Sequence, residues 1–328
     1  MTPAAIARQN RTRILLAFAA VYVIWGSTYL FIKYAIEDVP PFMMGAARFT
    51  AAGALLYALA RWRGAKAPNL QDWRSAAVTG VLMLGMGNGA VMWAELTVPT
   101  GIVALIVSTT PIWIVIFDWL RPRGVRPRLP VFVGLTLGLA GMIILIGPRA
   151  IVGEGHVDEI GVLILLLGSL GWSIGTILSK GSKRSSAPLV YSSLQMIAAG
   201  VAMLITSIIL GEHTVFSAGD VSARAFFSWL YLVLAGSIIG YTAYIYLLSK
   251  VSAAKAATYA YVNPIIAVLL GWAFLSEPIG MRTLLAAAVI LGGVAIITLS
   301  QGHAMHATGE HPLPTQPPAE PRRERSAA

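Results

Sequence analysis

Two residue pairs, Thr110-Pro111 and Asn263-Pro264, lie inside long apolar stretches and combine a polar side chain with a proline. Within a helix, a proline removes one backbone hydrogen bond and leaves the carbonyl group four residues earlier unpaired. Bent helices that present carbonyl groups and polar side chains can bind a small molecule without any catalytic group. Both pairs are therefore candidates for lining a substrate site and for acting as hinges. Kinks that serve packing alone are the alternative.

Two tryptophans, Trp25 and Trp172, each stand near the middle of an apolar stretch rather than at its end. An indole offers a flat ring for stacking on another ring or a cation, and an N–H group that needs an acceptor when buried. The remaining candidate substrate-binding residues are polar or aromatic: Ser27, Tyr29, Asn88, Ser173, Tyr244 and Tyr259. Each one alone is compatible with ordinary helix packing. Together they predict an apolar, aromatic cavity that suits a neutral or zwitterionic small molecule.

Arg48 is a basic residue deep inside an apolar stretch, and Glu95 ends the next stretch. A charge at that depth needs a partner or a water-filled cavity. We expect Arg48 to pair with Glu95, either as a structural ion pair or as an outer gate that docks a substrate carboxylate. A guanidinium that reaches the outer lipid headgroups is the alternative. No Asp or Glu lies in the middle of a stretch, which weakens the case for proton antiport and makes facilitated diffusion a credible alternative, and the sequence leaves both mechanisms open.

Several classes of enzyme are excluded by what the chain lacks. It contains no cysteine, which removes cysteine nucleophiles, disulfides and cysteine-bound metals. It also has no G-x-x-x-x-G-K-[ST] loop, no H-E-x-x-H motif and no G-x-S-x-G motif. The sequence therefore predicts no catalytic residue, no metal site and no cofactor, and so no enzyme.

The elements that must position these side chains are membrane helices. Of 328 residues, 57% are hydrophobic and 12% charged, whereas a soluble domain has about 25% charged residues. A helix needs about 20 apolar residues to cross a bilayer, and these continuous apolar runs lack the alternation of a β-barrel. The sequence predicts an all-α membrane protein with ten transmembrane helices at 14–34, 42–60, 74–94, 99–120, 130–147, 160–180, 188–210, 227–248, 254–275 and 281–299.

The basic residues indicate how these spans are oriented. If the N-terminus is cytoplasmic, most of the 24 Lys and Arg residues fall in inner loops and termini, and most acidic residues fall outside. Such a bias is the positive-inside pattern, so both termini are predicted to be cytoplasmic. The net charge of +10 is then explained without a nucleic-acid partner.

The chain repeats itself in two halves. Residues that align are Trp25 with Trp172, Lys33 with Lys180, Pro41 with Pro188 and, after small shifts, Pro111 with Pro264. Each half holds five spans, an odd number, so the second half enters the membrane with opposite polarity. Inverted repeats are typical of secondary transporters with a shared midplane site. The predicted divisions are a cytoplasmic N-terminus (1–13), a first repeat (14–148), a second repeat (157–300) and a disordered cytoplasmic tail (301–328).

Several short motifs resemble a known family. They are Trp25-Gly26-Ser27-Thr28-Tyr29, Arg48-Phe49, Trp93-Ala94-Glu95 and the Thr-Pro and Asn-Pro pairs. With the two five-span repeats, they look like the EamA family of the drug/metabolite transporter (DMT) superfamily, over nearly the whole chain apart from the tail. The resemblance implies ten helices around a central cavity and, usually, export of amino acids, other metabolites or drugs.

We therefore expect a monomeric secondary transporter in the bacterial inner membrane, in contact with lipid and a small-molecule substrate. Export of amino acids, aromatic ones included, by alternating access is the leading hypothesis. A multidrug or nucleotide-sugar carrier is the alternative within transport. A membrane scaffold or embedded enzyme is the alternative outside it, and it would need a cluster of titratable residues at one membrane face, which the sequence does not show.

Overall fold

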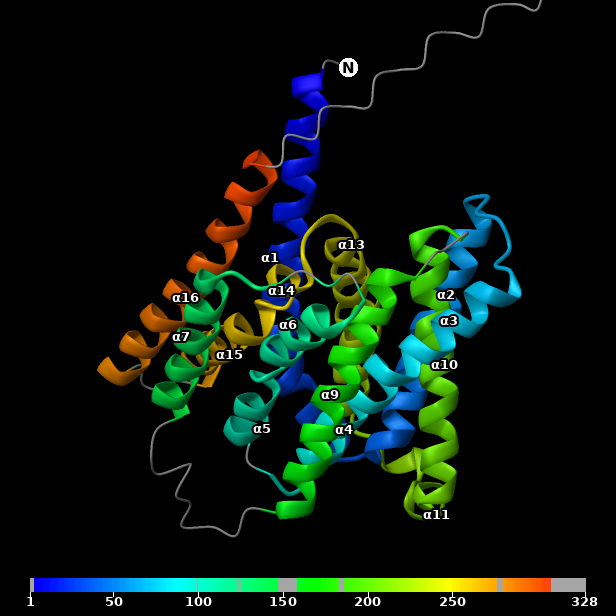
Figure 1. Ribbon diagram of the computed structural model, residues 1–328. Helices are drawn as coiled ribbons and strands as arrows, with labels where there is room; N and C mark the ends of the chain where they lie inside the picture. The colour runs from blue at the N-terminus through cyan, green and yellow to red at the C-terminus, as the bar shows by residue number, and fades with distance from the viewer. Residues whose placement is uncertain are drawn as a thin grey trace, which may run out of the picture.

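The computed structural model describes residues 3–98, 100–122, 124, 126–146, 158–182, 186–275 and 280–307, which form helices and turns without a strand (Figure 1). The prediction of a helical protein is confirmed for these residues. The first part contains α1 (Pro3–Ile36), α2 (Pro41–Trp62), α3 (Leu70–Gly80), η1 (Val81–Asn88), α4 (Gly89–Ala94), α5 (Thr100–Val107), α6 (Thr110–Leu120) and α7 (Leu129–Ile146).

The second part begins at α9 (Glu159–Gly181) and α10 (Pro188–Ile209), followed by the short α11 (Glu212–Val215) and η2 (Ala218–Asp220). It continues with α12 (Ala223–Tyr231), η3 (Leu232–Tyr241), α13 (Thr242–Lys250), α14 (Ala253–Ala256), α15 (Tyr259–Leu275) and α16 (Met281–Ala307). Helix α16 thus extends past the predicted start of the tail. The rest of that tail, 308–328, and the predicted linker between the repeats lie outside the described residues.

Among the described residues, seven helical segments are long and apolar enough to cross a membrane: Arg8–Ile36, Pro41–Trp62, Leu70–Ala94, Val103–Leu120, Glu159–Gly181, Pro188–Ile209 and Ala223–Lys250. Two shorter apolar helices, Leu129–Leu145 and Met281–Ile297, coincide with the fifth and tenth predicted spans. The ninth predicted span contains α14 and α15.

Local chemistry sets many of the helix ends. Asn69 accepts a hydrogen bond from the Asp72 backbone and forms a capping box with it, and the Ser222 side chain caps α12. Pro41 and Pro188 stand at the first position of α2 and α10, where the missing N–H costs nothing. The fourth predicted span is interrupted between α5 and α6, immediately before Pro111, whereas Pro264 lies inside α15.

Two segments, η1 and η3, wind as π-helices in the middle of the third and eighth predicted spans. π-Helical turns are rare and frequently occur at functional sites, because the wider winding displaces side chains and carbonyl groups from the regular helix surface. Both segments belong to the wall of the cavity described below.

The two halves interlock rather than standing apart. Helix α1 packs against α12, η3, α13 and α15, and in the same way α9 packs against α3, η1, α4, α5 and α6. Helix α2 runs along α10, and α7 runs along α16, as Figure 1 shows. The largest buried cluster lies where α1 and α9 meet these neighbours, and it contains Trp25 and Trp172. The crossing of the halves therefore brings both tryptophans into the core.

Candidate functional site

Four aromatic rings from four helices meet at the centre of the molecule: Trp25 of α1, Trp172 of α9, Tyr244 of α13 and Tyr259 of α15. Every pair among them is in ring contact, with centroid distances between 4.8 and 6.3 Å. Four of these six contacts are edge-to-face, a geometry that ring quadrupoles favour, and the other two are tilted. The structure thus brings together four residues that the sequence placed in the cavity.

Hydrogen bonds fix the orientation of this aromatic cluster. The Trp25 indole Nε1 donates to the Gly236 carbonyl of η3 at 3.1 Å, and the Tyr244 hydroxyl is 3.0 Å from the Thr176 hydroxyl. A Cβ atom on Gly240 would lie only 2.5 Å from Trp25 Nε1. Glycine at that position therefore lets η3 approach closely enough for the indole to reach a carbonyl.

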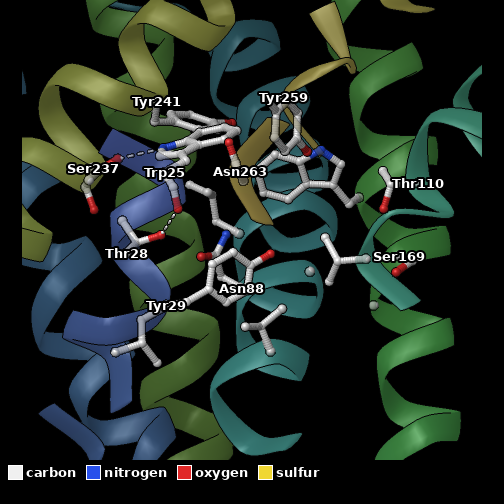
Figure 2. A pocket seen from close by; sticks show the side chains of 18 of the residues that line it. Trp25, Thr28, Tyr29, Asn88, Thr110, Ser169, Ser237, Tyr241, Tyr259 and Asn263 are labelled. Atoms are coloured by element: carbon white, nitrogen blue, oxygen red, sulfur yellow. Dashed lines mark hydrogen bonds between the residues drawn. The ribbon is translucent and has the colours of Figure 1, made fainter. Parts of the chain in front are cut away.

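A cavity of about 730 Å³, including its open mouth, lies against the cluster (Figure 2). Drug-sized ligands bind in pockets of this order. Trp25, Trp172 and Tyr259 form part of its wall, and both π-helices contribute to it. Its polar lining consists of Thr28, Tyr29, Arg48, Asn88, Thr110, Ser169, Ser237, Tyr241 and Asn263. An apolar and aromatic wall with a few polar groups can bind and orient a small molecule.

The expected ion pair between Arg48 and Glu95 does not form, and that prediction is wrong. Arg48 lines the cavity at 3% exposure, its Nε donates to the Ser237 hydroxyl at 2.9 Å, and its Nη1 has no hydrogen-bond partner among the described residues. The reason is geometric: α2 packs against η3, so the guanidinium reaches Ser237. Both oxygens of Glu95 are without a hydrogen-bond partner in the described part of the chain.

A polar acceptor complements this cation. Asn263 of α15 lines the cavity at 3% exposure, and its Oδ1 makes no hydrogen bond to any described residue. A buried amide oxygen without a partner loses the free energy of its hydration unless a ligand or water restores a donor. The cavity therefore presents a guanidinium to an anionic group and an amide oxygen to a donor.

The predicted site residues separate into two groups. Those in the cavity wall are Trp25, Tyr29, Arg48, Asn88, Thr110, Trp172, Tyr259 and Asn263. Those outside the wall are Ser27, Glu95, Pro111, Ser173, Tyr244 and Pro264. Ser27 faces away, toward α12, where its hydroxyl is 2.7 Å from that of Tyr231. Ser173 donates instead to the Ser169 carbonyl at 2.7 Å.

Four polar wall residues are missing from the predicted set: Thr28, Ser169, Ser237 and Tyr241. Helical periodicity points to two of them, because Thr28 lies three residues after Trp25 and Ser169 three residues before Trp172, and residues three apart share a helix face. Ser237 carried no signal in the sequence, since its role depends on the approach of α2 to η3.

Metal binding has no support in the described residues, where no group of three His, Cys, Asp or Glu side chains lies close enough to hold an ion.

Replacing Trp25 with phenylalanine is expected to slow any flux through this cavity severalfold. The variant keeps an aromatic ring but removes the hydrogen bond to Gly236, worth about 1 kcal/mol or roughly fivefold in an equilibrium constant. The measurement is the rate of substrate efflux from liposomes at equal protein content. Trp62→Phe is the matched control, since Trp62 is 82% exposed at the end of α2. Equal losses in both variants would contradict a role specific to Trp25.

Comparison with known proteins finds a family model and several relatives. The model described as the EamA-like transporter family matches residues 12–147 and 159–299. The "uncharacterized inner membrane transporter YedA" of Escherichia coli K12 is 40% identical over 288 residues, which cover 87% of this chain and 90% of that one. The "uncharacterized transporter YvbV" of Bacillus subtilis 168 is 27% identical, covering 88% and 92% of the two chains. A solved crystal structure with 22% identity has a TM-score of 0.73 over 90% of this chain and 99% of its own, and so shares the fold.

Proposed function

Because this chain belongs to the EamA-like transporter family, we propose that it exports a small zwitterionic metabolite across the bacterial inner membrane by alternating access. Amino acids, aromatic ones included, are the proposed substrates. The single observation that carries this proposal is the cavity in which Arg48 and Asn263 face the same space beside the aromatic cluster.

The chemistry of the cavity supports a zwitterion. The guanidinium of Arg48 matches a carboxylate in shape and charge, and its Nη1 has no partner among the described residues. An ammonium group can donate to Asn263 Oδ1 and lie over the ring of Trp25 or Tyr259, where the negative ring face attracts a cation. An aromatic side chain of the substrate can stack in the same cluster. A multidrug cation would meet the positive charge of Arg48, which disfavours that alternative.

The packing supports alternating access between two inverted five-helix repeats. The family model matches the chain twice, over 12–147 and 159–299, and the contacts of α1 in one half are repeated by those of α9 in the other. Two halves related in this way can exchange inward-open and outward-open arrangements around one site. The helix break before Pro111 and the proline inside α15 are the proposed hinges. One chain supplies the whole site, so a monomer suffices.

The test is a flux assay on the purified protein. It is reconstituted into liposomes loaded with a panel of labelled amino acids, and efflux is followed with and without a pH gradient. We expect efflux of some members, aromatic ones among them, well above that of protein-free liposomes. Sugars linked to nucleotides and lipophilic cations, loaded in parallel, serve as comparisons. Flux without selectivity among the amino acids, or only of the comparison compounds, would refute the amino-acid assignment.

A further inference from the structure

Glu95 is a buried carboxylate that the substrate site does not use. It follows the last residue of the span Leu70–Ala94 and is 2% exposed. Neither carboxylate oxygen has a hydrogen-bond partner, and neither belongs to an ion pair of the described residues. Its neighbours Ala94 and Val98 are buried with Leu165 in an apolar cluster. An ionised carboxylate in such surroundings loses its hydration without replacement, so the neutral form is favoured.

None of the described charged or titratable groups on the elements around α4 pairs with the Glu95 carboxylate. On α1, Tyr29 packs against the apolar cluster, and the exposed Lys33 follows it one turn later on the same helix face. On α2, Arg48 is directed to Ser237. At the start of α9, Asp158 accepts hydrogen bonds from Thr97 and from the Ile160 backbone. Burial raises the pKa of Glu95 to about 8, and the positive charge of Lys33 opposes that rise.

Glu95 is also tied to the cavity wall. Its backbone N–H donates to the carbonyl of Val91 at 3.0 Å, and both Val91 and Tyr29 line the cavity. A movement that separates α1 from α4 would therefore open the cavity between Tyr29 and Val91. The same movement would expose the carboxylate to water and to the ammonium of Lys33.

We propose that Glu95 is the proton-binding site that couples substrate movement to proton movement. In the arrangement seen here, which we call closed because α1 and α4 are in contact, the carboxyl group holds one proton. When α1 and α4 separate, the O–H bond breaks, the proton passes to water, and the carboxylate is stabilised by hydration and by Lys33. This inference rests on the proposed transport function and, of the two mechanisms that the sequence leaves open, selects proton-coupled exchange over facilitated diffusion.

The sign of the pH dependence follows from the raised pKa. The closed arrangement binds the proton more tightly than the open, hydrated arrangement does. Proton binding therefore stabilises the closed arrangement relative to the open one by its full amount at low pH. That advantage is lost as pH rises from the ordinary carboxyl value of 4.5 to about 8. Alkaline pH therefore favours the open arrangement.

The first experiment needs no substrate. Infrared spectra of the purified full-length protein, titrated from acid to alkaline pH, should contain a protonated carboxyl band that disappears near pH 8. The band should be absent from Glu95→Gln and present in Glu37→Gln, which alters an exposed carboxylate directly after the end of α1. Lys33→Gln should move the midpoint to higher pH, because it removes the charge that favours ionisation. An unchanged titration in Glu95→Gln overturns the proposal.

The second experiment tests the coupling. Proteoliposomes containing a pH dye are given a gradient of the amino acid that moved fastest in the panel. In the wild type and in Glu37→Gln, the luminal pH should change in step with substrate flux. Glu95→Gln should exchange labelled for unlabelled substrate at least as fast as the wild type does, but without a change in luminal pH. A wild type that transports without moving protons overturns the inference and leaves the proposed function intact. Loss of substrate exchange in Glu95→Gln overturns it as well, since Glu95 would then be a substrate ligand.

Discussion

Replacing Arg48 with glutamine is expected to lower substrate transport at least tenfold. The guanidinium is the positive charge in the cavity wall. A tenfold loss corresponds to about 1.4 kcal/mol of binding free energy, close to the lower end of the roughly 1.5–3 kcal/mol that a hydrogen bond to a charged group contributes. The effect should appear as a raised KM for efflux and as weaker binding in detergent. Arg48→Lys should recover only part of the activity, because an ammonium cannot replace the planar two-pronged donor.

Arg63→Gln is the matched control for this prediction, since Arg63 is an exposed arginine at the end of the same helix. It should transport as the wild type does. If Arg48→Gln leaves KM unchanged and reduces only the amount of folded protein, Arg48 is structural and the carboxylate subsite is wrong. If Arg48→Gln gains flux of lipophilic cations, the multidrug alternative is favoured.

Replacing Gly80 with leucine is expected to prevent the two halves from assembling. A Cβ atom at Gly80 would lie 2.3 Å from the backbone oxygen of Gln195 and 2.7 Å from its Cα, so α3 and α10 would have to separate. Overpacking against backbone atoms cannot be relieved by a rotamer change, and its cost is about 3 kcal/mol or more. The measurement is the thermal unfolding midpoint and the monodisperse fraction in detergent. Both should fall sharply.

Gly292→Ala is the control for this second prediction, because nothing lies within 4 Å of the position that its Cβ would occupy. It should be neutral or slightly stabilising, since alanine favours a helix over glycine. A Gly80→Leu protein with a normal unfolding midpoint would show that α3 and α10 are not in close contact in the folded protein.

The sequence by itself determined the helical class, the approximate spans and the central aromatic residues. Continuous apolar runs of about 20 residues have one stable solution in a bilayer, because unpaired backbone groups are costly in hydrocarbon. The internal repeat aligns Trp25 with Trp172. Ring contacts between them and with Tyr244 and Tyr259 agree with that alignment.

The direction in which a side chain points within a span is not determined by these apolar sequences. A stretch that is apolar all round has no amphipathic stripe, so its sequence does not show which face meets the cavity. Polarity alone predicts Ser27 and Ser173 in the wall, yet their hydroxyls bond Tyr231 and the Ser169 carbonyl. The π-helical winding of η1 and η3 also changes the face that a residue presents, as at Ser237.

Only the tertiary structure decided the surroundings of Arg48 and Glu95. Sequence proximity and opposite sign predicted a pair between Arg48 and Glu95, but charge pairing depends on distances of a few ångströms that interhelical packing sets. The approach of α2 to η3 directs Arg48 into the cavity, and the apolar cluster around α4 leaves Glu95 buried alone. The residue types specified a transporter with few charges, whereas the packing of the two halves assigned those charges separate places.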